Sequence, residues 1–329
     1  MPMQSPLLTV EDLSVSYITG AQPVHAVRNM SFSLGEGMSL GIVGESGSGK
    51  STLILALLRL LNPRVAEVKG RVLFGGRDVL ELPEGELSRM RWQEIAIVFQ
   101  KAMNAFSPVH RIGDFMTDVY SIHRPNAPVL DAKLRVKELL ETVSLSVGVA
   151  ELYPHELSGG MMQRVSIALA LMFNPKLLIL DEATTALDVV TQTQILNEII
   201  SIEKSLNLTR IMVTHDISVV ASSCKEVAIL YAGELLEYGP VLQTLSNPAH
   251  PYTRLLMESF PDPHMPSDKE LKSIPGSLPD MRNIFPGCVF APRCPLALPQ
   301  CHMQKPCFTE IGEGHKAACH LLTREDIHL

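Results

Sequence analysis

The sequence lacks any apolar run close to the roughly eighteen residues that a membrane-spanning helix requires. Residues 1–11 also lack the basic start and the long apolar core of a signal peptide. An excess of positive charge is missing as well, because the formal net charge is −7. We therefore expect a cytosolic chain that does not bind nucleic acid, since such binding normally needs a clustered Lys/Arg surface.

Cysteine is scarce over most of the chain. Cys224 stands alone, and we expect it to pack as a small hydrophobic residue. The other five cysteines crowd the C-terminal part of the chain: Cys288, Cys294, Cys301, Cys307 and Cys319. In a cytosolic protein such clustering indicates a metal site rather than disulfides.

The 329 residues, 46% of them apolar, suffice for two or three domains with a sizeable core. The first half begins with strand-like stretches and continues with a helical insertion: strands at 7–18, 30–34, 68–74 and 95–99, and helices at 111–123 and 131–144. The second half has the βαβ rhythm of an α/β nucleotide-binding fold: helices at 161–173, 189–205 and 217–222, and strands at 177–180, 209–213 and 227–231. Ten prolines in residues 261–306 predict a loop-rich segment that is ordered by something other than a large core.

Residues 44–51, Gly-Glu-Ser-Gly-Ser-Gly-Lys-Ser, fit the pattern G-x-x-x-x-G-K-[ST] between a strand-like and a helix-like stretch. In such a loop, backbone N–H groups surround phosphate oxygens, and the following helix adds the positive end of its dipole. Lys50 is predicted to reach the β and γ phosphates, and Ser51 to ligate Mg²⁺. The predicted nucleotide-binding residues of this segment are Gly44, Ser46, Gly47, Ser48, Gly49, Lys50, Ser51 and Thr52.

The apolar strand at 177–180 ends in two carboxylates, Asp181 and Glu182. Asp181 is predicted to hold Mg²⁺ through a water, and Glu182 to activate the water that attacks the γ phosphate. Adjacent residues of a strand point to opposite faces, so we expect one acid on the metal and the other on the water. Paired acids after a strand also serve as helix caps or solvated turns, and the pair alone does not decide between these roles.

Residues 157–160, Leu-Ser-Gly-Gly, begin a helix-like stretch shortly before this acidic strand. The run resembles the signature motif of the ATP-binding-cassette family, whose Ser158, Gly159 and Gly160 would face an anion. The resemblance implies an ATPase with an α/β fold: a RecA-like mixed sheet core, an antiparallel β layer and a helical subdomain at about 101–157. The whole cassette would span residues 1–258.

Further positions match the same family. Gln100 resembles the Q-loop glutamine, which touches Mg²⁺ and the attacking water, and His215 resembles the switch histidine that contacts the γ phosphate. Asp188 resembles the D-loop aspartate, which communicates across a dimer, and Tyr17 resembles the aromatic residue that stacks on adenine. The resemblance implies two chains arranged head to tail, with ATP between the Lys50 loop of one chain and the signature turn of the other.

The run Asn-Pro-Ala-His-Pro-Tyr-Thr at 247–253 and the Cys-rich extension, residues 259–329, resemble the dipeptide and oligopeptide importer ATPases. This branch implies a [4Fe-4S] cluster, which takes four cysteine thiolates. We assign as its ligands Cys288, Cys294, Cys301 and Cys319. Cys307 is treated as an extra cysteine, although it could replace Cys319. The spacing alone also allows tetrahedral zinc with His302 or His320.

The resemblance implies the ATPase of a membrane importer for dipeptides or oligopeptides, peripheral to the cytoplasmic face of the membrane. Its implied partners are a second cassette chain, two transmembrane permease subunits and an extracytoplasmic solute-binding protein. Nickel, another chelated metal or an oligosaccharide stay open as cargo, because cargo is chosen by subunits other than this chain. A soluble cassette ATPase of DNA repair or translation is the alternative, but long heptad coils and a second cassette are missing.

Overall fold

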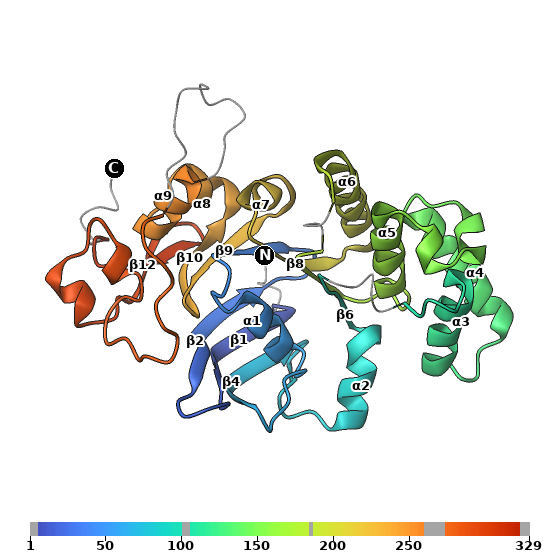
Figure 1. The fold of residues 1–329 in the computed structure, drawn as a ribbon, viewed down its shortest axis with the longest axis horizontal. Coiled ribbons are helices and arrows are strands. Elements are labelled where there is room, and N and C mark those ends of the chain that lie inside the picture. Colours follow the sequence, from blue (N-terminus) through green and yellow to red (C-terminus); the bar gives the residue numbers. More distant parts are fainter. Residues whose placement is uncertain (1–5, 101–105, 184–186, 260–273, 323–329) are drawn as a thin grey trace. The chain divides into compact units, whose positions relative to one another are not determined.

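The computed structural model describes residues 6–100, 106–183, 187–259 and 274–322 (Figure 1). The chain divides into two compact units. Unit one comprises residues 1–35, 39–81 and 213–329, and unit two comprises residues 36–38 and 82–212. The predicted phosphate loop and the Cys-rich extension therefore belong to unit one, whereas the acidic strand and the signature turn belong to unit two.

Unit one contains an antiparallel sheet with the strand order β2-β1-β4-β5. Its strands are β1 (Leu8–Tyr17), β2 (Val24–Leu34), β4 (Ala66–Phe74) and β5 (Arg77–Asp78). Apolar and polar side chains alternate along β1 on either side of an irregularity at Glu11 and Asp12, and Leu8, Val10, Leu13 and Val15 are buried. The β-rich beginning of the chain forms this layer.

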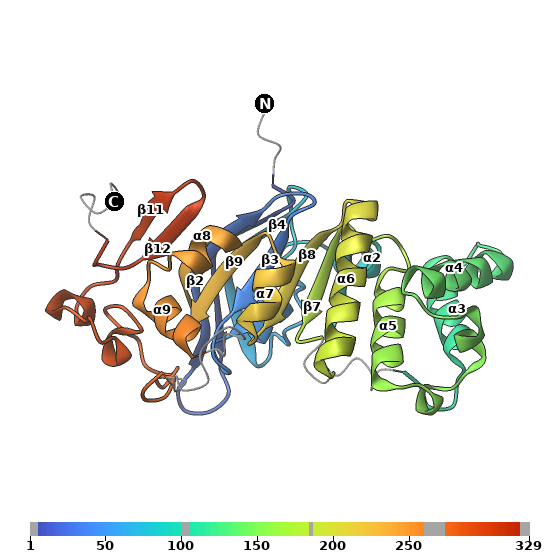
Figure 2. The same ribbon diagram turned by 90° about the horizontal axis from the view of Figure 1, so that it is seen from above.

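The other strands of unit one follow the order β11-β12-β10-β9-β3. They are β3 (Ser39–Val43), β9 (Glu226–Tyr231), β10 (Glu234–Pro240), β11 (Phe308–Gly312) and β12 (His315–Ala318). β3 and β9 pair in parallel, and the remaining neighbours pair in antiparallel fashion. Every residue of β3 is buried, as expected for a central parallel strand. The β11–β12 hairpin of the extension lies at the edge of this layer (Figure 2).

Helices and short 3₁₀ turns complete unit one. They are α1 (Lys50–Leu57), α7 (Ile217–Ser223), α8 (Val241–Ser246), α9 (Pro251–Glu258), η4 (Ala291–Arg293) and η5 (Pro299–His302). The centre of the core is aromatic, because the rings of Tyr231, Tyr252 and Phe290 lie 4.8–5.2 Å apart. Cys224 packs, partly buried, against the same core, as the sequence predicts.

Unit two contains strands in the order β8-β7-β6. The strands are β6 (Ile95–Val98), β7 (Leu177–Asp181) and β8 (Thr209–Thr214), whose last two residues belong to unit one. The helices are α2 (Glu84–Gln93), α3 (Ile112–His123), α4 (Val129–Thr142), η2 (Val147–Glu151), η3 (Pro154–Glu156), α5 (Gly159–Ala170) and α6 (Val189–Leu206). Figures 1 and 2 both show α5 between α6 and the α3–α4 pair.

No strand was predicted at β10, whose sequence Glu-Leu-Leu-Glu-Tyr-Gly-Pro is not a continuous apolar run. Glu237 in its middle is completely buried and would normally mark a loop. Its carboxylate accepts hydrogen bonds from Ala249 N (2.8 Å) and Thr253 Oγ1 (2.5 Å), and it pairs with His315 Nε2 at 2.7 Å. These partners supply what a buried carboxylate needs, so a charged residue occupies a core strand.

Among the described residues, no helix combines the length and the apolar character that a membrane crossing requires.

Candidate nucleotide site

The phosphate loop connects β3 to α1 in unit one. Lys50 begins α1 and is 5% exposed, and its ammonium donates to the carbonyl oxygens of Gly44 (2.7 Å) and Glu45 (3.0 Å). The backbone N–H of Ser48 also donates to the Glu45 carbonyl oxygen, at 3.1 Å. The loop is thereby curled around the lysine that is predicted to reach the phosphates.

Two glycines of this loop stand where a larger residue cannot. A Cβ atom on Gly44 would lie 2.1 Å from the carbonyl oxygen of Leu230. Gly49 has φ +97°, a left-handed conformation, and its Cβ would lie 2.1 Å from the carbonyl oxygen of Ala26. The motif's glycines are therefore required by close backbone packing, in addition to any approach by a phosphate.

The loop carries the groups expected of an anion site. The hydroxyl of Ser48 is buried and has no hydrogen-bond partner among the described residues, an uncommon state for a buried polar atom. Ser51 is exposed in the first turn of α1, where helix N–H groups favour an anion. Tyr17, predicted to stack on adenine, has its hydroxyl 3.2 Å from Thr52 Oγ1. The loop, Tyr17 and Thr52 thus come together in unit one.

The two predicted acids lie at the end of β7 in unit two. Asp181 is the last residue of the strand and is 7% exposed. Glu182 adopts a left-handed conformation with φ 49°, and its carboxylate accepts a hydrogen bond from Gln100 Nε2 at 2.7 Å. β7 ends at Asp181, so strand alternation does not set the direction of the Glu182 side chain, and the division of roles between the two acids stays a prediction. The pairing of Glu182 with Gln100 joins two residues that the sequence analysis assigned to one reaction.

The signature turn begins α5 in the same unit. Ser158 is the N-cap, and its hydroxyl oxygen accepts a hydrogen bond from the N–H of Met161 at 3.2 Å. Ser158 and Gly159 are exposed. A Cβ atom on Gly160 would lie 2.7 Å from Thr191 Cγ2 of α6, so the second glycine lets the two helices approach. The turn presents the start of a helix to solvent, as an anion-binding role requires.

The remaining predicted residues occupy helix and strand ends. Asp188 caps α6, because its carboxylate accepts from the N–H groups of Val190 (3.1 Å) and Thr191 (3.0 Å) and from Thr191 Oγ1 (2.6 Å). These hydrogen bonds with Thr191 lower the pKa of Asp188. His215 is exposed directly after β8, in unit one. Asp188 thus has a structural role beside the predicted one across a dimer.

The four cysteines assigned to the cluster line one small cavity of unit one, together with His250 and His320. Burial raises the pKa of the Cys288 thiol to about 11 and also raises the pKa values of Cys294 and Cys319. Cys307 is exposed and is not among the residues that line the cavity, which agrees with its treatment as an extra. Among the described residues, no three or more His, Cys, Asp or Glu side chains are arranged to hold a metal ion.

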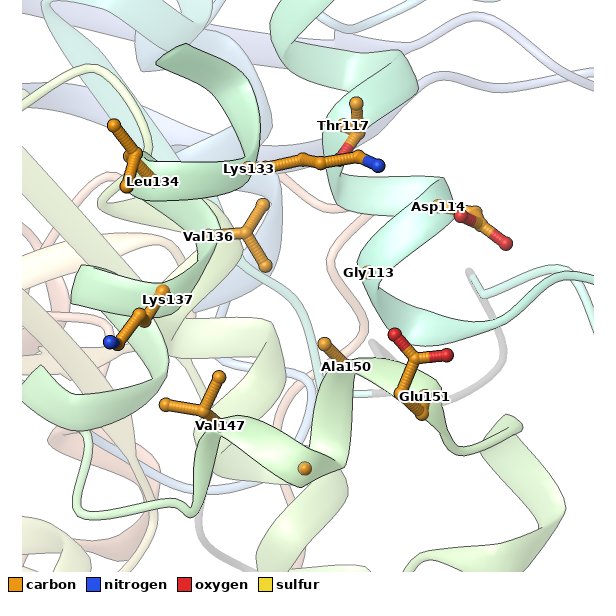
Figure 3. Close-up of a pocket in the computed structure, with 11 residues that line it drawn as sticks. Gly113, Asp114, Thr117, Lys133, Leu134, Val136, Lys137, Val147, Ala150 and Glu151 are labelled. Carbon is orange, nitrogen blue, oxygen red and sulfur yellow. The ribbon is translucent and has the colours of Figure 1, made fainter. Parts of the chain in front are cut away.

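A second hollow, of about 440 Å³, lies between α3, α4 and η2 of unit two (Figure 3). Asp114 of α3 and Glu151 of η2 lie on one side of it, and Lys133 and Lys137 of α4 lie on the other. It contains none of the predicted nucleotide or metal residues, so it is separate from the elements of the site described above.

Comparison with known proteins identifies the family. A model described as "ABC transporter" matches residues 27–185, and one described as "Oligopeptide/dipeptide transporter, C-terminal region" matches residues 236–301. The probable peptide ABC transporter ATP-binding protein y4tR of Sinorhizobium fredii is 41% identical over 97% of this chain and 96% of its own length. The chain belongs to the ABC transporter family. The oligopeptide transport ATP-binding protein OppD of Escherichia coli is 40% identical over 95% of this chain and 92% of its own length.

A solved structure of an ABC cassette supports the fold assignment. The dimeric post-hydrolysis state of the cassette MJ0796, bound to ADP and Pi, is 28% identical, with a TM-score of 0.64 over 71% of this chain and 98% of that chain. The predicted cassette ATPase fold is confirmed, as is the resemblance to the oligopeptide and dipeptide branch. This ABC protein is an ATPase.

Sequence reasoning missed the contacts that the extension makes with the phosphate loop of this ABC ATPase. Arg293 donates to both carboxylate oxygens of Glu45, at 3.0 Å each, although 248 positions separate the two residues. Neither residue carries a local pattern that points to the other. Arg293 does directly precede Cys294, one of the cysteines assigned to the cluster.

Proposed function

We propose that this ABC ATPase powers the import of dipeptides or oligopeptides across a membrane. The observation that carries the proposal is the match of residues 236–301 to the C-terminal region of oligopeptide/dipeptide transporters, outside residues 27–185, which match the ABC transporter model. The relatives named for peptide, oligopeptide and dipeptide transport extend over nearly the whole chain. Nickel, another chelated metal or an oligosaccharide is the second candidate cargo.

The proposed machine contains two cassette chains that meet head to tail. Each chain has one phosphate loop and one signature turn. Lys50 of the loop is buried, whereas Ser158 at the start of α5 is exposed. ATP would lie between the Lys50 loop of one chain and the signature turn of the other. Two transmembrane permease subunits and a solute-binding protein complete the assembly, with the ATPase peripheral to the cytoplasmic face.

The proposed chemistry assigns a role to each of the predicted site residues. Lys50 and the loop N–H groups bind the phosphates. Ser51 and Gln100 would supply oxygen ligands to Mg²⁺ and Asp181 would hold it through a water; the ion would neutralise phosphate charge. Glu182 accepts the proton of the attacking water, and its bond to Gln100 orients its carboxylate. His215 contacts the γ phosphate, and hydrolysis releases the closed dimer.

We also propose that Cys288, Cys294, Cys301 and Cys319 hold a [4Fe-4S] cluster. The support is the donor set, because four thiols of one chain line one buried cavity, which matches the four thiolates of such a cluster. Tetrahedral zinc is the alternative metal, with His320, which lines the same cavity, as a further ligand. The cluster is assigned a structural or regulatory role, since no flavin or second redox motif is visible in the sequence.

Transport is tested by reconstituting the chain with its permease subunits and binding protein in proteoliposomes. Uptake of labelled di- and oligopeptides that requires ATP supports the proposal, and uptake of nickel or an oligosaccharide in place of peptides contradicts it. The cluster is tested separately, by iron, zinc and acid-labile sulfide analysis of anaerobically purified chain. About four irons and four sulfides per chain are expected, whereas stoichiometric zinc without sulfide would overturn the assignment.

A further inference from the structure

The phosphate loop of this ATPase contains a carboxylate, whose negative charge is of the same sign as that of ATP. Glu45 is the second residue of the loop, and its side chain is 25% exposed. The Glu45 carbonyl oxygen accepts from the Lys50 ammonium at 3.0 Å, so the residue lies within the same curl as the phosphate-binding lysine. An uncompensated negative charge here would repel the triphosphate.

Arg293 of the extension neutralises this carboxylate. Its Nη1 atom lies 3.0 Å from both carboxylate oxygens of Glu45 and 3.1 Å from the hydroxyl of Tyr231, and its side chain is 8% exposed. Two hydrogen bonds to the backbone hold the guanidinium in place: Nε donates to the carbonyl oxygen of Pro275 (2.7 Å), and Nη2 donates to that of Ile274 (3.1 Å). A partly buried, anchored pair of this kind is screened by solvent less than a surface pair.

Two further contacts between the C-terminal part of the chain and the loop are neutral. The N–H of Glu45 donates to the hydroxyl of Tyr252 at 3.1 Å, and Leu278 comes within 3.8 Å of the Cβ position of Gly47. These contacts shape the loop but leave its charge unchanged. The charge of Glu45 is therefore compensated from the extension by Arg293.

We infer that Arg293 is a positioning residue of the nucleotide site, which holds and neutralises the Glu45 carboxylate so that the phosphate loop presents no free negative charge to ATP. The extension is thereby a component of the ATP site in its own chain. The inference concerns ATP affinity and does not depend on the cargo or on the cluster.

The test measures binding of mant-ATP with Mg²⁺ to the full chain, together with the ATPase rate at saturating ATP. Arg293→Gln should weaken binding about tenfold and leave kcat within about twofold. Adding Glu45→Gln to this variant removes the free carboxylate and should restore affinity. Native affinity in Arg293→Gln, or a double variant as weak as the single one, would overturn the inference.

A second variant separates neutralisation from support of the extension. Arg293→Lys keeps the charge but lacks the forked donors that reach Ile274 and Pro275. It should bind mant-ATP nearly as well as the native chain, even where its melting temperature falls; a loss of affinity equal to that of Arg293→Gln contradicts the inference. Arg282→Gln is the matched control, because this extension arginine pairs with Asp280 at the surface and should leave affinity unchanged.

Discussion

Replacing Glu182 by Gln changes one atom of the proposed catalytic base and little else. Glu182 Oε2 accepts from Gln100 Nε2 at 2.7 Å, and the carbonyl oxygen of a glutamine accepts the same hydrogen bond. Glutamine also meets the same backbone cost as glutamate at φ 49°. The variant should therefore fold as the native chain does, with a change in unfolding free energy within about 0.5 kcal/mol.

The catalytic loss follows from the missing proton acceptor. A positioned general base contributes about 10²- to 10⁴-fold to a rate, so the barrier to hydrolysis should rise by about 3 to 5 kcal/mol. ATP binding does not use this proton transfer, so affinity should persist. The variant should accumulate as an ATP-bound closed dimer.

The assay combines phosphate release, mant-ATP titration and size-exclusion chromatography with ATP and Mg²⁺. The expected result is native affinity, dimer formation and a phosphate-release rate at least about a hundredfold below native. Glu138→Gln makes the same chemical change on the exposed side of α4 and should keep the native rate. Hydrolysis by Glu182→Gln at the native rate would remove Glu182 from the proposed base role.

Three further substitutions test the phosphate loop, a buried ion pair and the cysteine cavity. Gly49→Ala should abolish mant-ATP binding in a titration, because its Cβ would lie 2.1 Å from a backbone oxygen at a left-handed φ. Glu203→Ala leaves the completely buried Arg210 without its carboxylate partner at 3.0 Å and should cost about 3 to 5 kcal/mol in urea unfolding; an unchanged midpoint contradicts this. Cys294→Ser should lower the iron content of anaerobically purified chain while mant-ATP affinity stays native; full iron content means that the assigned ligands are wrong.

The sequence predicted those elements that are determined by a short stretch of neighbouring residues. Strands such as β3 and β7 are continuous apolar runs that end in a loop or an acid, and the phosphate loop follows from a short motif with fixed glycine positions. Helix boundaries shifted by a few residues; α1, for instance, begins at Lys50. Local pattern was enough because each element is defined by its own periodicity.

Long-range partners could not be predicted in the same way. No strand was predicted at β10, and the buried Glu237 within it is compensated by His315 from a strand 78 positions later. The left-handed turn at Glu182 removed it from the alternation of β7, and no residue type in that run marks the turn. In both cases a side chain or backbone conformation is stabilised by tertiary partners that override the local pattern.

The extension illustrates the same limit on a larger scale. Its many prolines predict a segment ordered by something other than a large core, and within the described residues the order comes from the core of unit one itself. Val289 and Phe290 are completely buried, and the Phe290 ring packs against those of Tyr231 and Tyr252. Tyr231 ends β9, whose Leu230 carbonyl oxygen fixes the position of Gly44. The residues that order the extension are therefore the same aromatic side chains that pack against the end of β9, next to the phosphate loop.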